Sequence, residues 1–193
     1  VQSMAESSVD EVLHLWQGAG YYSRARRLHA LAVEVVQSHG GVLPDDYDSL
    51  LKLPGIGPYT AAAVASIAFM EPVACVDGNI RRVMARQTNQ EEPSPTQVQS
   101  FANEQLHENA PGDWNQAMME LGALLCRPRN PSCEECPVHD TCLGRSRARE
   151  LPRPKKIKKK TEQYNCIVRV DDRGLPELHQ RPDTGLFAGL WGP

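Results

Sequence analysis

Four cysteines constrain the fold of this chain more than any other feature. Cys126, Cys133, Cys136 and Cys142 form the pattern C-x6-C-x2-C-x5-C within seventeen residues. Four thiolates in one short loop suit a 4Fe-4S cluster or a structural zinc ion, and the generic spacing does not separate the two. The chain of 193 residues has none of the marks of a small disulfide-rich secreted scaffold. We therefore expect a metal centre.

A glycine-rich turn lies between two helical stretches in the first half of the chain. Its sequence is Leu53-Pro54-Gly55-Ile56-Gly57, and an apolar helix follows it. Glycines on both sides of an apolar residue permit a tight hairpin with exposed N–H groups, to which the next helix adds its own N-terminus. Such donors suit a DNA phosphate. An ordinary helix connection is the alternative interpretation.

A candidate catalytic carboxylate follows that helix. The segment Val76-Asp77-Gly78-Asn79 precedes Arg81 and Arg82. Taken alone, Asp77 is an N-cap for the next helix. One buried helix separates it from Tyr59, however, so the chain must return towards the hairpin. This return would bring the Asp77 carboxylate close to bound DNA.

The periodicity of apolar residues predicts a mainly α chain that ends in β structure. Helices are expected at about 9–16 after Ser7 or Ser8, 23–39, 45–51, 59–69, 79–86, 96–109 and 114–125, the last capped by Asp113. The helix at 59–69 is apolar on most sides and is expected to be buried. Alternation of Cys166, Val168 and Val170, a turn at 171–174 and a second strand at 175–181 predict a hairpin. The expected domains are a helical region (1–143), a basic linker (144–162) and the start of a β-containing domain (163–193).

Basic residues are concentrated in the linker. Residues 145–160 hold nine of the 21 Lys and Arg residues against the single acid Glu150, although the formal net charge of the chain is −3. Such a block is typical of a solvated linker, a nuclear-import signal or a nucleic-acid-binding arm. No apolar run approaches the roughly 18–20 residues that span a bilayer, and no signal peptide is evident. The abrupt start at Val1 leads us to expect a fragment.

Taken together and in this order, the three motifs resemble the helix-hairpin-helix DNA glycosylases of the endonuclease III superfamily. The cysteine spacing is the cluster signature of that superfamily, which implies a 4Fe-4S cluster, with zinc as the alternative. Bifunctional members carry a lysine two residues after the second hairpin glycine, where this chain has Tyr59. A tyrosine cannot form a Schiff base, so strand cleavage by that route is not expected.

Further segments resemble the MutY family of adenine glycosylases, in its eukaryotic form. These are residues 15–26, 76–79 and 115–122, while residues 187–191 resemble the start of that family's Nudix-like domain. The resemblance implies a monofunctional base-excision-repair enzyme acting on double-stranded DNA with adenine opposite 8-oxoguanine or guanine. It also implies a nuclear location, with the mitochondrion as a second one. We expect a monomer, with repair proteins as partners through the linker.

The resemblance also implies residue roles. Asp77 would stabilise the positive charge that develops on the sugar, Tyr59 would lie beside it, and Asn79 would orient it. Tyr21 would wedge into the base stack, and Gln116 and Met119 would line the adenine pocket. The DNA-binding set is completed by Gly55, Gly57, Arg24 and Arg81.

One family feature has no counterpart in the chain. The glutamate that protonates adenine matches no residue here, so we expect the chain alone to be inactive. Three alternatives remain: a bifunctional endonuclease III-like lyase, a non-catalytic DNA-binding module with a four-cysteine metal site, and a redox-signalling cluster protein.

Overall fold

The computed structural model describes residues 1–154, 161, 163, 167–182, 184–185 and 187–192. The chain divides into two compact units, Val1–Pro154 and Lys155–Pro193, which we describe separately. The division lies within the predicted linker. Lys155–Lys160 and Cys166 lie outside the described residues.

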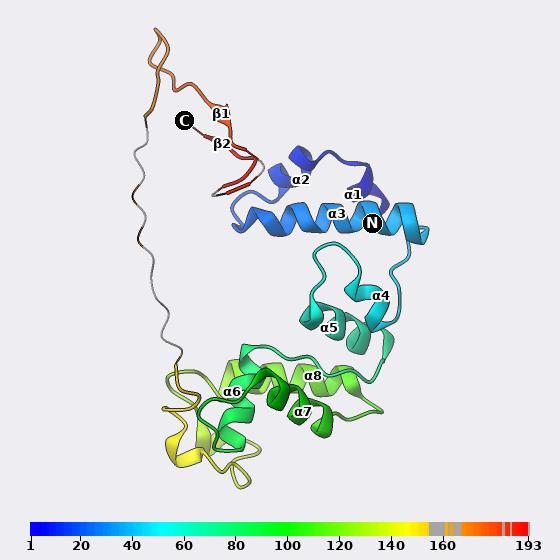
Figure 1. Cartoon of the computed structure of the whole chain (residues 1–193), viewed down its shortest axis with the longest axis vertical. Coiled ribbons are helices and arrows are strands. Elements are labelled where there is room, and N and C mark those ends of the chain that lie inside the picture. The colour runs from blue at the N-terminus through cyan, green and yellow to red at the C-terminus, as the bar shows by residue number, and fades with distance from the viewer. Residues whose placement is uncertain (155–160, 162, 164–166, 183, 186, 193) are drawn as a thin grey trace. The chain divides into compact units, whose positions relative to one another are not determined.

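The first unit is helical (Figure 1). Its α-helices are α1 (Gln2–Glu6), α2 (Val9–Leu15), α3 (Tyr22–His39), α4 (Tyr47–Leu51), α5 (Pro58–Phe69), α6 (Gly78–Gln87), α7 (Pro95–Gln105) and α8 (Pro111–Glu120). A π-helical turn, η1 (Leu121–Leu125), continues α8, and the 3-10 turns η2 (Cys133–Glu135) and η3 (Arg145–Arg147) follow it. No helix in the described part of the chain is both long and apolar enough to cross a membrane.

Side-chain caps explain where several helices begin. Ser8 accepts from the N–H of Glu11 and starts α2, and Ser94 does the same for α7 through Gln97. Asp46 caps α4 by accepting from the N–H of Ser49. These contacts use backbone donors that the helix leaves unpaired.

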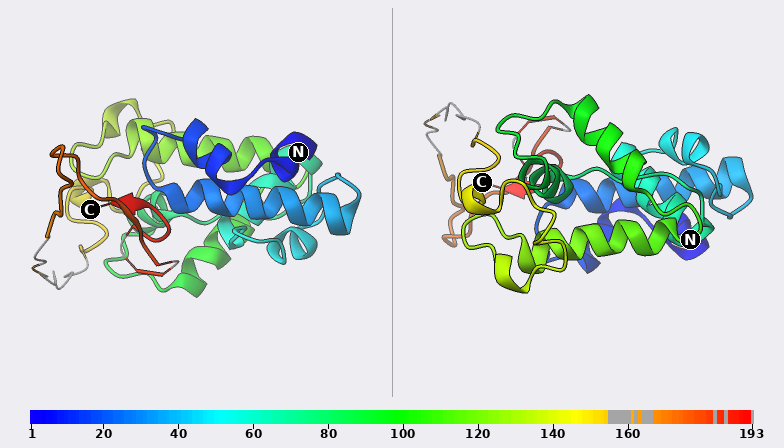
Figure 2. Two further views of the ribbon diagram at one scale, coloured as in Figure 1. Left: turned by 90° about the horizontal axis from the view of Figure 1, so that it is seen from above. Right: turned by 90° about the horizontal axis from the view of Figure 1, so that it is seen from below.

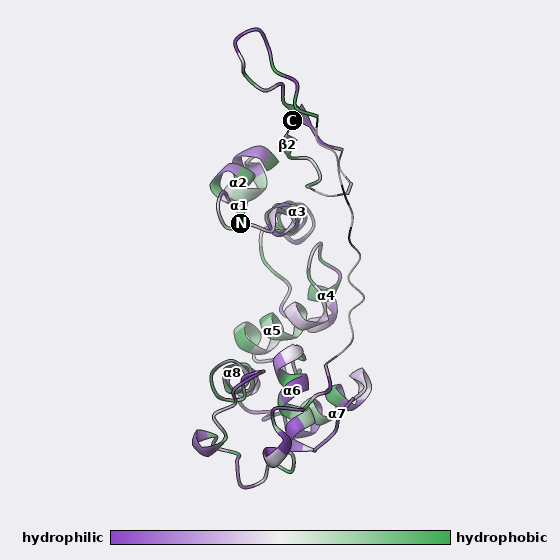
Figure 3. Ribbon diagram, turned by 90° about the vertical axis from the view of Figure 1, so that its left-hand side faces the viewer, coloured by the Kyte–Doolittle hydropathy of each residue, from purple (hydrophilic) through white to green (hydrophobic). Residues whose placement is uncertain are grey.

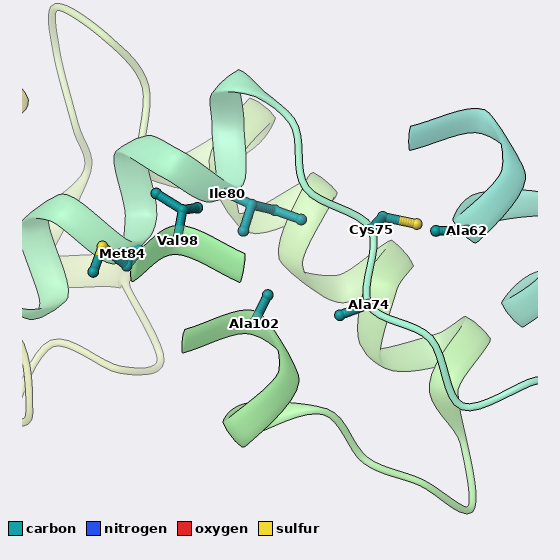
Figure 4. Packing of buried hydrophobic residues seen from close by; sticks show 7 residues of the cluster. All are labelled: Ala62, Ala74, Cys75, Ile80, Met84, Val98 and Ala102. Atoms are coloured by element: carbon teal, nitrogen blue, oxygen red, sulfur yellow. The ribbon is translucent and has the colours of Figure 1, made fainter. Parts of the chain in front are cut away.

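Two hydrophobic clusters meet at α5. Ala61 and Ala65 pack with Val35, Leu50 and Leu53 in one cluster. Ala62 belongs to the second, which is shown in Figure 4. Its other buried members are Ala74, Cys75, Ile80, Met84, Val98 and Ala102. The small side chains of α5 therefore let neighbouring helices approach it from two sides, and the helix is largely hydrophobic along its length (Figure 3).

The remaining helices of this unit lie on two sides of α5, with α1 to α3 on one side and α6 to α8 on the other (Figure 1). Figure 2 shows the first group from above and the second from below. The long helix α3 packs against α1 and α2, where Val12, Leu13 and Ala25 form a third cluster. On the other side, α8 packs on α5, and α6 contacts both α7 and α8. Residues far apart in the sequence, at α5, α6 and α8, are thus neighbours in space.

Three predicted features of these helices need correction. Asp113 does not cap the last helix: α8 begins at Pro111, whose fixed φ suits a first turn, and Ala110 is the N-cap. The helix predicted to reach 109 ends at Gln105, because Leu106 is extended. The apolar helix α5 is only partly buried, since Ile67 and Phe69 are 44% and 39% exposed.

The second unit holds little regular structure in its described residues. Strand β1 (His179–Gln180) pairs antiparallel with β2 (Trp191–Gly192), and a single bridge joins Val170 to Pro176. The turn at Asp171–Gly174 forms as predicted, with the N–H of Asp171 bonded to the carbonyl of Leu175. The strand predicted at 175–181 is wrong in extent: its first part meets residues 169–170 through the Val170–Pro176 bridge and the bond from Glu177 N to Arg169 O, and its last part pairs with β2 instead.

The segment after the cysteines, residues 145–154, packs within the first unit beside α6. Ala148 and Leu151 are 5% and 2% exposed. Arg147 and Arg153 both form ion pairs with Glu91 in the loop after α6, at 2.6 and 2.5 Å. These contacts anchor residues 145–154 beside α6.

Candidate active site and metal centre

The glycine hairpin forms the entry to α5. Gly55 has φ +77°, and a Cβ built on it would lie 2.7 Å from the Cβ of Arg27 in α3. Its lack of a side chain therefore serves both the left-handed backbone and the close approach of α3. Gly57 is the N-cap of α5 and provides no side-chain cap. The first N–H groups of α5 and its dipole thus remain available to an anion such as a DNA phosphate.

Asp77 lies at the start of α6, where its two oxygens make different contacts. Oδ1 accepts from the N–H of Ile80 at 2.8 Å, which is the N-cap interaction. Oδ2 accepts from Nδ2 of Asn79 at 2.9 Å. The side chain is only partly buried. Each carboxylate oxygen can accept more than one hydrogen bond, so the cap leaves capacity for a further interaction.

Tyr59 connects α5 with α8 and lies within the field of Asp77. Its hydroxyl donates to Sδ of Met119 at 3.0 Å. Burial raises the pKa of Tyr59, and the negative charge of Asp77 raises it further. Tyr59 therefore remains a neutral phenol beside the carboxylate at physiological pH.

Helix α8 presents different side chains on two faces. Gln116 is exposed and its amide donates to the carbonyl of Gly112 at 3.2 Å, while Met119 lies three residues on and meets Tyr59. Asn115 is fully buried. Its amide accepts from the N–H of Cys75 at 2.9 Å and donates to Ser66 Oγ and the carbonyl of Val73, at 2.8 and 2.9 Å. Asn115 therefore fixes the segment that leads to Asp77 against α5 and α8.

Tyr21 and Arg24 lie at the start of α3, apart from this group. Tyr21 is 81% exposed and has φ +47°. The Arg24 guanidinium carbon lies 5.4 Å from the centroid of the Tyr21 ring and 5.6 Å from that of Trp16. Among the described residues, no hydrogen bond or ion pair connects Tyr21 or Arg24 with Asp77. Arg81 lies partly buried on α6.

The four cysteines line one cavity of about 30 Å³. Arg86 and His139 also contribute to its wall. The loop is bonded to the end of α6, because Arg86 O accepts from Gly144 N at 2.7 Å and Gln87 O from Leu143 N at 3.1 Å. A thiol-lined cavity in a loop held in this way fits a centre bound by four thiolates.

The arrangement of the cysteines differs from that expected around one ion. A tetrahedral zinc with bonds of about 2.3 Å draws its four thiolates into close contact. Within the described ranges, no three His, Cys, Asp or Glu side chains are grouped so that they could hold a single metal ion.

A chain of hydrogen bonds joins the cysteine loop to Asp77. Arg82 donates from Nε to the carbonyl of Cys126 at 2.8 Å and from Nη2 to the carbonyl of Gly122 at 2.6 Å. The same Nη2 donates to Oδ1 of Asn79 at 2.9 Å. Because Asn79 in turn donates to Asp77, the carboxylate is tied to the loop through two side chains.

The roles of Arg82, Arg86 and Asn115 were not predicted from the sequence. Arg81 was predicted to bind DNA, but Arg82 is the residue that bonds to Asn79. The sequence did contain a signal for a joint role of two of them, since Arg82 and Arg86 are four residues apart and share one helical face. Nothing in the sequence alone placed the cysteine loop against that face.

Comparison with known proteins assigns the chain to a class. Residues 1–108 match the HhH-GPD superfamily of base excision DNA repair proteins. Residues 126–142 match the iron–sulfur binding domain of endonuclease III. The chain therefore belongs to the HhH-GPD superfamily, and its cysteine loop is an iron–sulfur site. The predicted mainly α helix-hairpin-helix fold and iron–sulfur centre are confirmed. Cys126, Cys133, Cys136 and Cys142 would hold the cluster, which cross-links the loop when bound.

Two curated relatives of the chain share one description. The chain is similar to the adenine DNA glycosylase of Homo sapiens, with 44% identity over 96% of this chain and 33% of the relative. It is also similar to that of Mus musculus, with 35% identity over 99% of this chain and 47% of the relative. The chain thus spans between a third and about half of the length of these relatives, and the resemblance predicted from its motifs is confirmed.

Solved structures agree with the fold. A thermostable thymine-DNA glycosylase matches with a TM-score of 0.70 and 29% identity, over 76% of this chain and 70% of that one. An endonuclease III trapped in a covalent intermediate with DNA matches with a TM-score of 0.67 and 26% identity, over the same fractions.

Proposed function

We propose that the protein is a monofunctional DNA glycosylase that removes adenine mispaired with 8-oxoguanine or guanine. One observation carries the proposal: the Asp77 carboxylate is held by Asn79 at the start of α6, beside Tyr59 in the first turn after the hairpin. The similarity to adenine DNA glycosylases supports the choice of base.

The reaction hydrolyses the bond between C1′ of the sugar and the adenine nitrogen. As that bond breaks, its electron pair leaves with adenine, which takes up a proton, and positive charge develops on the sugar. Asp77 stabilises this charge through its nearby carboxylate, and water then supplies the hydroxyl group at C1′. The adenine must first leave the base stack, at a cost of a few kcal/mol.

The neighbours of Asp77 keep it oriented. Asn79 and the N–H of Ile80 both donate to the carboxylate and fix its position at the start of α6. Tyr59 places a neutral phenol beside Asp77 and does not act as a nucleophile. Gln116, on the exposed face of α8, would hydrogen-bond the edge of the extruded adenine, and Met119 would pack against it.

Double-stranded DNA is the proposed partner. The hairpin of Gly55 and Gly57 would hold a backbone phosphate, and Arg24 and Arg81 would add positive charge. The exposed ring of Tyr21 would stack beside the mispair, since an aromatic face can support an unstacked base.

The absence of a lysine at position 59 opposes the alternative of a bifunctional lyase. A lyase needs an amine that forms a Schiff base with the sugar, and the Tyr59 phenol cannot supply one. The alternative of a non-catalytic DNA-binding module predicts tight duplex binding without base release.

A single-turnover assay with the full-length protein tests these alternatives. The substrate is a duplex with adenine opposite 8-oxoguanine, and the control duplex has adenine opposite thymine. We expect adenine release from the mispair alone, leaving a strand that breaks only after alkali treatment. Strand breaks without alkali would favour the lyase, and tight binding without release would favour the binding module.

We also propose a nuclear location, with the mitochondrion as a second one, on the basis of the basic segment Lys155–Lys160. Imaging of the tagged protein with and without neutral substitutions at these lysines tests this proposal. Unchanged nuclear localisation in the neutralised variant would contradict a role for the segment in import.

A further inference from the structure

Arg86 is the largest side chain that is fully buried in the described part of the chain. It lies near the end of α6 and is 2% exposed. A guanidinium remains charged under all ordinary conditions. A charge removed from water in this way is strongly unfavourable unless an opposite charge or a set of hydrogen bonds replaces the water.

The hydrogen bonds of Arg86 are satisfied almost entirely by neutral groups. Nε donates to the carbonyl of Leu151 at 2.9 Å. The Nη1 and Nη2 groups donate to the carbonyls of Cys126, Arg127 and Pro128, at 3.0, 2.8 and 3.0 Å. These carbonyls satisfy the donors, but none of them carries a neutralising charge.

The opposite charge that Arg86 needs comes from the cysteines. Across the described residues, Arg86 forms no ion pair with a carboxylate. Its Nη1 lies 3.2 Å from Sγ of Cys126, and its side chain lines the cavity that all four cysteines share. Four thiolates carry more negative charge than a divalent core neutralises, so an iron–sulfur centre bound there is an anion.

A second guanidinium, that of Arg82, increases the need for a negative charge beside Arg86. Arg82 and Arg86 both donate to the same carbonyl oxygen, that of Cys126. Two like charges that converge on one oxygen repel each other, and an anion beside them offsets this repulsion.

We propose that Arg86 is the buried counter-ion of the iron–sulfur centre and sets its reduction potential. The positive charge and the N–H donated to Cys126 Sγ both favour the more negative, reduced form of the cluster. Loss of the guanidinium would therefore make the potential more negative and the cluster easier to oxidise. This inference rests on the iron–sulfur site and is independent of which base the protein releases.

The reduction potential of the bound cluster tests this proposal directly. We compare the cluster-loaded wild type with Arg86→Met, which keeps the length of the side chain and removes its charge. The backbone contacts of residue 86 with Gly144 remain in this variant. Arg129→Met is the matched control, because Arg129 lies in the same cysteine loop but is exposed to solvent.

We expect Arg86→Met to shift the ratio of oxidised to reduced cluster at least about tenfold at a fixed potential. This corresponds to about 59 mV to the negative side for a one-electron couple. Arg129→Met should shift the ratio less than about threefold, because solvent screens its charge. A fully loaded Arg86→Met protein with the wild-type potential would overturn the proposal.

A second comparison covers the case in which Arg86→Met fails to load. Cluster occupancy is then measured by absorbance per folded protein in Arg86→Lys and Arg86→Gln. The counter-ion role predicts higher occupancy with lysine, which keeps the charge. Equal occupancy in the two variants would overturn the proposal.

Discussion

Asp77 serves the fold and the proposed chemistry with the same side chain. The sequence left two interpretations open, a helix cap or a catalytic carboxylate, and the geometry accommodates both. One oxygen caps α6 through Ile80, and the other is held by Asn79. A residue pattern alone could not predict this, because the second contact depends on the rotamer of Asn79, which Arg82 fixes from the other side.

Substitution of the two hairpin glycines should have unequal effects on stability. Gly55→Ala places a Cβ 2.7 Å from Arg27 and forces φ +77° on alanine. We expect it to lower the free energy of unfolding by about 1–3 kcal/mol. Gly57→Ala meets nothing within 4 Å at an ordinary φ, so its cost should stay below about 1 kcal/mol. Denaturant unfolding measures both, and equal losses would show that the close approach of α3 is unimportant.

Arg82 should affect catalysis more than DNA binding. Arg82→Met removes the bond to Asn79, so the Asp77 carboxylate loses the support of its orienting neighbour. We expect single-turnover adenine release to slow about tenfold or more, with the duplex dissociation constant changed less than threefold. The comparison variant is Arg127→Met, whose side chain bonds to Asn130 and Ser132 within the cysteine loop. A parallel loss of binding in Arg82→Met would point to a DNA-contacting role instead.

At the scale of elements, capping residues predicted several helix boundaries correctly and missed others. Ser8, Asp77 and the glycines at the end of α3 mark boundaries that the structure reproduces. The start of α8 was misplaced because Pro111 supplies the helical φ without a side-chain acceptor. The extent of the C-terminal strands was misjudged, because alternation of side chains does not identify the pairing partner.

The packing of α5, α8 and the segment before Asp77 should depend on Asn115. Asn115→Leu leaves the N–H of Cys75 and the carbonyl of Val73 without their buried partner. We expect a loss of at least about 2 kcal/mol in the free energy of unfolding. Ser66→Ala removes only one of the three contacts of Asn115 and should cost less. Chemical denaturation measures the free energy of unfolding of both variants. A smaller loss for Asn115→Leu than for Ser66→Ala would contradict the proposed role of Asn115 in this packing.

Attachment of residues 145–154 should weaken at acidic pH. A hydrogen bond from Arg147, followed by the charge of Arg153, lowers the pKa of Glu91 below its ordinary value of 4.5. A lowered pKa in the folded state stabilises the protein above pH 4.5, and this stabilisation is lost as the pH falls through the folded-state value.

The stability difference between the wild type and Glu91→Gln should therefore be constant above about pH 5.5 and shrink below 4.5. Glu92→Gln is the control, since Glu92 makes a single, longer contact with Arg153 at 3.4 Å. Unfolding measured across this pH range checks the prediction. A difference that persists unchanged at the lowest pH would exclude the ion pairs as its cause.

At the scale of the whole molecule, the order of motifs predicted the class of protein, and the fold explains why they work together. The hairpin, Asp77 and the cysteine loop are separated in sequence but meet around α5, α6 and α8. The sequence could not predict that residues 145–154 return to α6, because those contacts join positions more than fifty residues apart. It likewise gave no indication that Arg86 is buried.

The most direct test of the central claim is adenine release by Asp77→Asn. Asparagine is also a good N-cap, so this variant keeps the contact with Ile80 while it removes the charge and the oxygen that accepts from Asn79. We predict that the full-length variant binds the duplex with adenine opposite 8-oxoguanine as tightly as the wild type. Its single-turnover release of adenine should fall at least about a hundredfold. Release at the wild-type rate would reduce Asp77 to a helix cap and contradict the proposed mechanism.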